Sequence, residues 1–218
     1  MGGGAVIDLA AKLEEADQPV QAVAAIAPWN GIPKIQAPST VANKIKAPVL
    51  LFCSKNDQIC PCSGPIGLAS GIGSSWSSYA MLRSVFDTSD NTWGGGVEAI
   101  YGDLKGGEDE GSNATLVEFD NGGHFALAGV TEDQVRGAFK SMDRSGLGGA
   151  ANILIDSMVG MGESVSNEGK DAAALATSDV KNITIAFLED KVAGEDESGY
   201  ERAVQEVEGN DGVTIKTK

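Results

Sequence analysis

Three short runs dominated by apolar residues are the most regular feature of the chain. They cover residues 20–27, 49–53 and 115–119. Continuous apolar runs of this length are typical of strands that are buried on both faces of a parallel sheet. We therefore predict three such strands, each followed by a loop that contains glycine, proline or polar residues.

Segments with helical spacing lie before, between and after these runs. Apolar residues at intervals of three and four positions predict one apolar face in each helix. The positions are Val6, Leu9, Ala10 and Leu13; Val135, Ala138, Phe139 and Met142; and Val180, Ile183, Phe187 and Leu188. Strands and helices in this arrangement predict an α/β fold, in which a mostly parallel sheet is flanked by helices.

The charge balance narrows the classes of function. The 218 residues include 31 acidic and 16 basic side chains, which gives a net charge of −15. So few basic groups argue against nucleic-acid binding, because phosphates would not be neutralised. Hydrophobic residues make up 42% of the chain, enough for a buried core. No apolar run approaches the length of about 18 residues that a membrane span needs.

The candidate chemistry centres on the loop Asp120-Asn121-Gly122-Gly123-His124-Phe125, which follows the third apolar run. His124 is the only histidine in the chain. Histidine is the side chain that changes charge nearest to neutral pH, which suits it to proton transfer. A glycine loop at a strand's end can present it to a reacting group. The alternative is a surface histidine with no role.

The chain begins Met1-Gly2-Gly3-Gly4, followed directly by the first helical segment. This start resembles the nucleophile elbow of α/β-hydrolases, a strand–turn–helix with the pattern Gly-x-Ser-x-Gly. In esterases and cutinase-like polyester hydrolases the elbow often reads Gly-His-Ser-Met-Gly-Gly-Gly. The resemblance implies that the chain starts one residue after the nucleophilic serine. The backbone N–H of Met1 would then be one oxyanion-hole donor. The alternative is a flexible glycine tag.

A second part of the resemblance follows the run at 49–53. Here the chain reads Asp57-Gln58-Ile59-Cys60-Pro61, and in these hydrolases the triad acid stands in a pattern such as Asp-x-Ile/Val-x-Pro. The resemblance implies that Asp57 accepts the Nδ1–H of His124 and orients its ring. The alternative for Asp57 is a helix cap or turn residue. Because the two residues are far apart in the chain, only the fold can bring them together.

Trp29 follows the first apolar run in the sequence Pro28-Trp29-Asn30-Gly31. Open α/β sheets bind ligands beyond the carboxyl ends of their strands. In the polyester-hydrolase relatives a tryptophan in a similar Ala-Pro-Trp context lines the substrate cleft. Trp29 is therefore a candidate substrate-binding surface, and ordinary packing at a strand end is the equal alternative.

Two segments are predicted to be insertions relative to that family, at about residues 63–113 and 145–179. The hydrolase-like domain would cover residues 1–200. Residues 201–218 would form an acidic tail, read as a solvated terminal helix with a fraying end. The first insertion contains an acidic group that lacks the regular spacing of an EF-hand, so a solvated loop is favoured over a calcium site. This group is Asp103, Glu108, Asp109 and Glu110.

The cysteines are Cys53, Cys60 and Cys62, an odd number that cannot all pair within the chain. Cys53 is expected to bridge to one of the other two, around the acid loop, if the protein is secreted. A Cys-Pro-Cys spacing with one remote histidine does not match a metal site. A catalytic thiol would need a nearby base and a lowered pKa. We predict no metal and no cofactor.

These features predict the C-terminal half of a serine esterase, with Asp57 and His124 as the acid and base of its triad. No Gly-x-Ser-x-Gly occurs in the chain, so the chain alone should not turn over small-molecule or polymeric esters. Two alternatives stay open: a non-catalytic binding or scaffold protein of this fold, and a dienelactone-hydrolase-like or lipase-like enzyme. A sheet edge without its neighbouring strand further predicts self-association.

Overall fold

The computed structural model describes residues 2–30, 38–57, 60–63, 96–105, 114–130, 170–194 and 197–218, with positions 134, 137 and 141. Within them, one sheet runs in the order β1-β2-β3-β4. Its strands are β1 (Val23–Ile26), β2 (Val49–Ser54), β3 (Ala114–Phe119) and β4 (Val213–Thr217). The first three are parallel, and β4 is antiparallel to β3. The three apolar runs thus form three parallel strands, as predicted.

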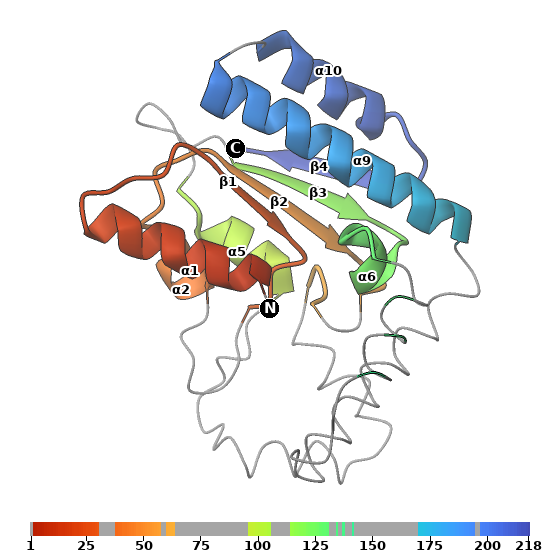
Figure 1. Cartoon of the computed structure of the whole chain (residues 1–218), viewed down its shortest axis with the longest axis horizontal. Helices are drawn as coiled ribbons and strands as arrows, with labels where there is room; N and C mark the ends of the chain where they lie inside the picture. The colour runs from red at the N-terminus through yellow and green to blue at the C-terminus, as the bar shows by residue number, and fades with distance from the viewer. Residues whose placement is uncertain are drawn as a thin grey trace, which may run out of the picture.

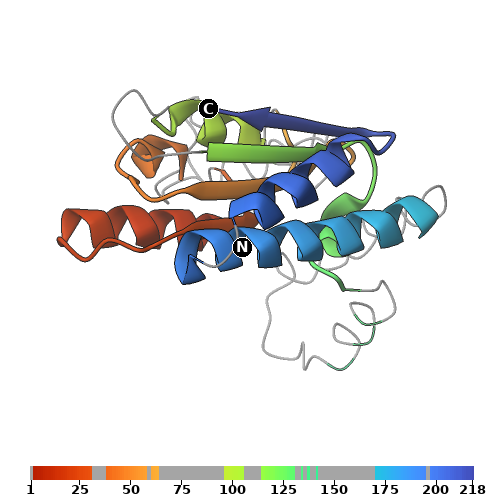
Figure 2. The ribbon, with the colours of Figure 1, turned by 90° about the horizontal axis from the view of Figure 1, so that it is seen from above.

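Helices cover both faces of this sheet (Figure 1). Successive residues of a strand point to opposite faces, and in β2 Leu51 and Leu50 belong to two separate apolar cores. The first core includes residues of α1 (Gly2–Glu15) and α5 (Gly96–Asp103), and the buried Val41 and Ala42 of α2 (Ser39–Ala42). The second includes residues of α9 (Lys170–Leu188) and α10 (Glu197–Glu208). Figure 2 shows α9 and α10 from above. The chain is therefore an α/β protein with a mostly parallel sheet.

Helix α1 buries only part of the face that its apolar spacing predicts, since Ala10 is buried and Leu13 is partly buried. Val6 and Leu9 are exposed, whereas Gly4, Ile7, Ala10 and Ala11 are buried. A Cβ atom added to Gly4 would lie 2.6 Å from the Trp29 indole nitrogen. Because α1 lies so close to the end of β1, a residue without a side chain is needed at Gly4, and the face that carries Gly4 is the buried one.

The terminal helix expected in this acidic region is confirmed as α10, but the segment 201–218 does not fray at its end, and that part of the prediction is wrong. It contains most of α10 and all of β4, which pairs with β3 from Thr115↔Thr217 to Phe119↔Val213. The Tyr200 hydroxyl also donates to Thr115 Oγ1 at 2.9 Å. The many acidic residues before β4 concealed a strand that completes the edge of the sheet.

A lysine bridge fastens β4 to the rest of the fold. Lys216 Nζ lies 2.8 Å from a carboxylate oxygen of Glu118 on β3 and 2.8 Å from one of Glu98 on α5. These two hydrogen bonds raise the pKa of the Lys216 ammonium, and the bond from Lys216 lowers the pKa of Glu98. The cluster thus ties a strand, its neighbour and a helix together.

Described helices lie wholly or partly inside both segments that are expected to be insertions. Helix α5 lies within 63–113, yet its Val97 and Ile100 belong to the first core. Helix α9 begins at Lys170, inside the expected 145–179 segment, and continues through a π-helical turn, η2 (Glu189–Ala193). The predicted apolar face of α9 is confirmed for Val180, Ile183 and Phe187, while Leu188 is 40% exposed. The predicted helical face at 135–142 lies outside the described side chains.

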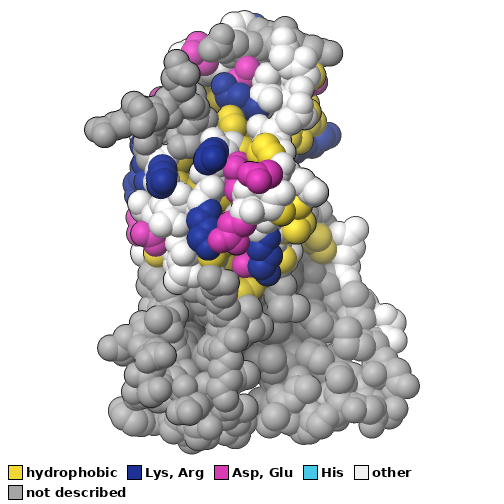
Figure 3. All heavy atoms as spheres, turned by 90° about the vertical axis from the view of Figure 1, so that its left-hand side faces the viewer, with side chains coloured by type: hydrophobic (Ala, Val, Ile, Leu, Met, Phe, Trp, Pro, Cys, Tyr) yellow, Lys and Arg dark blue, Asp and Glu magenta, His cyan; other side chains and the backbone are white. Residues whose placement is uncertain are grey.

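Basic, acidic and apolar side chains are interspersed on the face of the molecule in Figure 3. On α1 and after α2, exposed ion pairs join Lys12 to Asp8 and Lys44 to Glu15. The net negative charge therefore does not exclude basic groups from this part of the surface. None of the helices in the described ranges is long and apolar enough to cross a membrane.

Candidate active site

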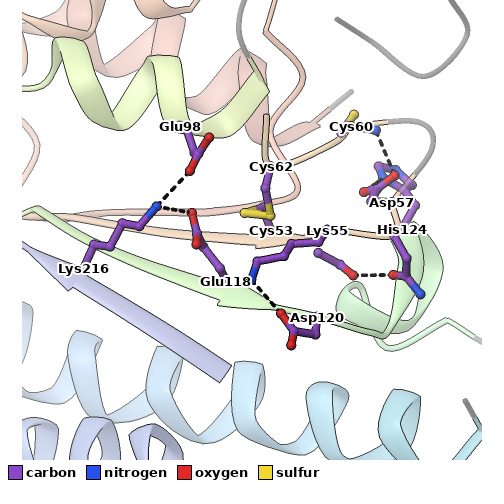
Figure 4. Close-up of a disulfide and its surroundings, with 12 residues drawn as sticks. Cys53, Lys55, Asp57, Cys60, Cys62, Glu98, Glu118, Asp120, His124 and Lys216 are labelled. Carbon is purple, nitrogen blue, oxygen red and sulfur yellow. Dashed lines mark hydrogen bonds and ion pairs between the residues drawn. A yellow bond between two sulfur atoms is a disulfide. The ribbon is translucent and has the colours of Figure 1, made fainter. Parts of the chain in front are cut away.

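The candidate acid and base meet at the carboxyl edge of the parallel strands. Asp57 follows β2, and His124 lies in α6 (Gly123–Leu127), which follows β3. His124 Nδ1 is 2.9 Å from Asp57 Oδ2 (Figure 4). The predicted contact is therefore confirmed, and it arises because neighbouring parallel strands end at the same edge of the sheet.

The environment of this pair orients the imidazole. The Asp57 side chain is fully buried and the His124 side chain is 19% exposed. The other carboxylate oxygen, Asp57 Oδ1, accepts the backbone N–H of Cys60 at 2.8 Å. The tautomer of His124 that suits a carboxylate partner at this place carries its proton on Nδ1 and donates it to Asp57. Nε2, on the far side of the ring, is then the nitrogen that can accept a proton from a reacting group.

A disulfide closes the loop that carries Asp57. It joins Cys53, near the end of β2, to Cys62. Cys62, and not Cys60, is therefore the partner of Cys53. Beyond it, the carbonyl oxygens of Pro61 and Cys62 accept the N–H groups of Val97 and Glu98 in α5. The acid loop is thus fixed at both ends, by β2 on one side and by α5 on the other.

Cys60 is the remaining cysteine, and its thiol is free and buried. Burial, and to a lesser degree the negative charge of Asp57, raise the pKa of the Cys60 thiol to about 12. A thiol in this state is protonated at neutral pH and is a poor nucleophile. Since Cys53 and Cys62 are oxidised, none of the three cysteines offers a thiolate to the site.

Glycines allow the histidine loop to pass close to α9. Gly122 and Gly123 have φ angles of 137° and 66°, a region that side-chain-bearing residues rarely adopt. A Cβ atom on Gly122 would also lie 3.3 Å from the Ala176 Cβ atom. The two glycines after the third strand therefore serve the sharp turn that brings His124 to Asp57.

The start of α1 lies at this same edge of the sheet. A Cβ atom on Gly3 would come within 2.6 Å of the Ile26 carbonyl oxygen and 3.0 Å of Pro28 Cα. The glycines therefore permit tight packing of the helix start against the end of β1. Met1, the candidate oxyanion donor, lies outside the described residues, as does Ile59 of the acid motif.

Trp29 packs mostly inside the protein. It is 9% exposed, belongs to the second core and contacts Gly4 of α1 through its indole. This arrangement fits the packing alternative, while a substrate-binding role stays a prediction because residues 31–37 lie outside the described ranges. The next residue, Asn30, is buried, and its side chain joins the Gly96 carbonyl to the Ser39 N–H.

No metal-binding group of three His, Cys, Asp or Glu side chains occurs in the described part of the chain. Of the acidic residues weighed for calcium, only Asp103 falls there.

Two residues next to the pair escaped the sequence analysis. Asn56 and Ser54 both accept the backbone N–H of Gly123, at 2.9 and 3.3 Å. The sequence did carry a signal for them. A glycine before a helix start cannot cap it with a side chain, so an acceptor has to come from another loop.

Comparisons with protein-family models and with curated proteins find no match to this chain.

Proposed function

We propose that this chain is the C-terminal part of a serine esterase of the α/β-hydrolase type. It carries the acid and base of a Ser-His-Asp triad, and the serine precedes Met1 in the complete protein. The observation that carries the proposal is the Asp57–His124 hydrogen bond at the carboxyl edge of a parallel sheet. The chain order of acid, then histidine, is the order of this family.

In the proposed mechanism the upstream serine attacks the carbonyl carbon of an ester. His124 Nε2 takes the serine proton as the new C–O bond forms, and then gives it to the departing alcohol as the ester bond breaks. Water then releases the acyl group by the same steps, with His124 again moving the proton. Asp57 stabilises the imidazolium and holds its tautomer, and the N–H of Met1 helps to stabilise the oxyanion.

The start of α1 supports this assignment. A nucleophile elbow places a serine between a strand and a helix, with glycines where turn and helix pack closely. The close approach of Gly3 and Gly4 to the chain after β1 agrees with that requirement. A serine just before α1 would then lie on the edge of the sheet that carries Asp57 and His124.

Two other nucleophiles near the pair are disfavoured. The Cys60 thiol is protonated because its pKa is raised to about 12. The Ser54 hydroxyl is buried and donates to Asn56 Oδ1 at 2.5 Å. Neither group is placed to attack a substrate, which is why the proposal assigns the nucleophile to the upstream chain.

The test compares the isolated chain with the complete protein encoded by the same gene. With a short-chain p-nitrophenyl ester, we expect no turnover by the isolated chain above its His124→Ala variant. The complete protein should hydrolyse the ester, with rates about 10³-fold or more above its own His124→Ala variant. Lys55→Ala is the matched control, because Lys55 lies in the same loop and its side chain pairs with Asp120 instead.

Two results would contradict the proposal. Turnover by the isolated chain that depends on His124 would mean that the nucleophile lies within residues 1–218. An upstream coding sequence with no serine in an elbow motif would favour a non-catalytic protein of the same fold. Polyester and dienelactone substrates tested on the complete protein would distinguish the related enzyme classes.

A further inference from the structure

Helix α6 carries His124 in its first turn but has no capping side chain of its own. Its N-cap is Gly122, and helix starts leave N–H groups without partners inside the helix. Serine, threonine, asparagine or aspartate usually fill this place. Gly122 cannot be replaced by one of them without strain, since its φ is 137° and Ala176 lies next to it. The cap must therefore come from elsewhere in the fold.

The acid loop provides that cap. The N–H of Gly123, the first residue of α6, donates to Asn56 Oδ1 at 2.9 Å and makes a longer contact of 3.3 Å with Ser54 Oγ. The Ser54 hydroxyl donates to the same Asn56 oxygen at 2.5 Å. An amide oxygen has two lone pairs and can accept both bonds. Because Ser54 is fully buried in β2, it fixes the direction in which the Asn56 amide points.

We propose that Asn56 is a positioning residue for the imidazole of His124. Asn56 immediately precedes Asp57, and Gly123 immediately precedes His124, so two neighbouring hydrogen bonds join the two loops. The Asn56 bond thus adds a second point of attachment directly beside the bond between His124 and Asp57. The catalytic meaning of this attachment rests on the proposed function, but the attachment itself does not.

A third link between the loops provides a contrast. Lys55 Nζ forms an ion pair with Asp120 at 2.7 Å, and both side chains are about half exposed, at 50% and 47%. Exposed ion pairs of long side chains hold their partners weakly. Lys55 is therefore the matched control, because it bridges the same two loops without touching α6.

The experiment compares the chain with its Asn56→Leu, Asn56→Asp and Lys55→Ala variants. Amide hydrogen exchange of the segment 120–127 measures the cap, and the reaction of the sole histidine with diethylpyrocarbonate measures the freedom of the ring. We expect Asn56→Leu to speed exchange in 120–127 about tenfold or more, with protection of β2 and β3 retained. His124 should react about threefold faster in that variant, because its loop opens more often.

Rescue separates positioning from general stability. Asn56→Asp keeps an acceptor of the same size and should stay within about twofold of the parent chain in both measurements, as should Lys55→Ala. The proposal is overturned if Asn56→Leu leaves 120–127 unchanged, if it speeds exchange in all strands alike, or if Asn56→Asp behaves like Asn56→Leu. No ester is used, so a failed esterase assay would refute the proposed function and leave this result standing.

Discussion

Two carboxylates in this protein are buried to almost the same degree, but they differ in partner and in position. Asp57 is 2% exposed and Glu118 is 3% exposed. Each has a basic partner, His124 at 2.9 Å and Lys216 at 2.8 Å. Burial and pairing alone therefore do not distinguish a site from a structural bridge (Figure 4).

The partner and the position make the difference. Glu118 lies within β3, and its lysine is bonded again to Glu98, so every strong contact of that cluster leads back into the fold. Asp57 lies beyond the end of β2, and its partner is an imidazole, which can pass a proton between its two nitrogens. A buried acid indicates chemistry when its partner can exchange protons and lies at the edge of the sheet where ligands bind.

The largest effect should come from replacing the acid of the site in the complete protein. We expect Asp57→Asn to lower kcat for ester hydrolysis about 10⁴-fold, because an amide favours the wrong imidazole tautomer. Lys216→Met should leave kcat within about threefold, since its bridge contacts neither residue of the pair. Steady-state kinetics on both variants measures kcat. Equal losses of kcat would mean that Asp57 and the Lys216 bridge do not differ in their effect on ester hydrolysis.

The disulfide comes next, because it anchors the Asp57 loop at Cys53, whose partner across the strands is Glu118. Replacing Cys53 and Cys62 by serine should lower the free energy of unfolding by about 2.5 kcal/mol, the chain-entropy value for so short a loop. Urea unfolding with and without a thiol reductant measures it. The reductant should destabilise the parent chain and leave the double variant unchanged. A parent chain whose stability the reductant does not change would show that the bond does not form.

Lys216→Met should destabilise the fold by about 1–2 kcal/mol, less than for a fully buried pair because Lys216 is partly exposed. The pKa of Lys216 is raised, so its contribution is present below pH 10.5 and is lost as pH rises beyond that value. The pKa of Glu98 is lowered, so its contribution is present above about pH 4.5 and is lost at lower pH.

Urea unfolding of the parent chain and of Lys216→Met, measured at intervals of about one pH unit from about pH 3 to 11, tests this pH dependence. The difference between the two proteins should be constant from about pH 5 to 10 and should shrink at both ends. A difference that grows as the pH falls below 4 would contradict the assigned directions.

Lys55→Ala should give the smallest change. The ion pair with Asp120 is exposed and salt-screened, so the urea midpoint should be unchanged within error at physiological ionic strength. A clear loss of stability would contradict the small contribution expected of this exposed pair.

The sequence predicted the parts of the fold that local patterns encode. Continuous apolar runs located β1, β2 and β3, and the residues after β2 and β3 supplied Asp57 and His124. These predictions succeeded because a parallel sheet buries both faces of its strands and aligns their carboxyl ends.

Elements that depend on tertiary packing were missed or misplaced. Strand β4 is short and follows an acidic helix, and only its pairing with β3 identifies it as part of the sheet. The inward face of α1 is set by the close approach of Gly4 to Trp29, which periodicity does not reveal. Asn56 was missed because its role depends on the N–H of Gly123, a residue in another loop.

The most direct test of the central claim is the proton NMR spectrum of the isolated chain, because its one histidine gives one set of imidazole signals. We predict a slowly exchanging Hδ1 resonance far downfield near neutral pH. It should disappear in Asp57→Ala and persist in Lys216→Met. A resonance that survives in Asp57→Ala, or one that is absent from the folded parent chain, would contradict the pairing of Asp57 with His124.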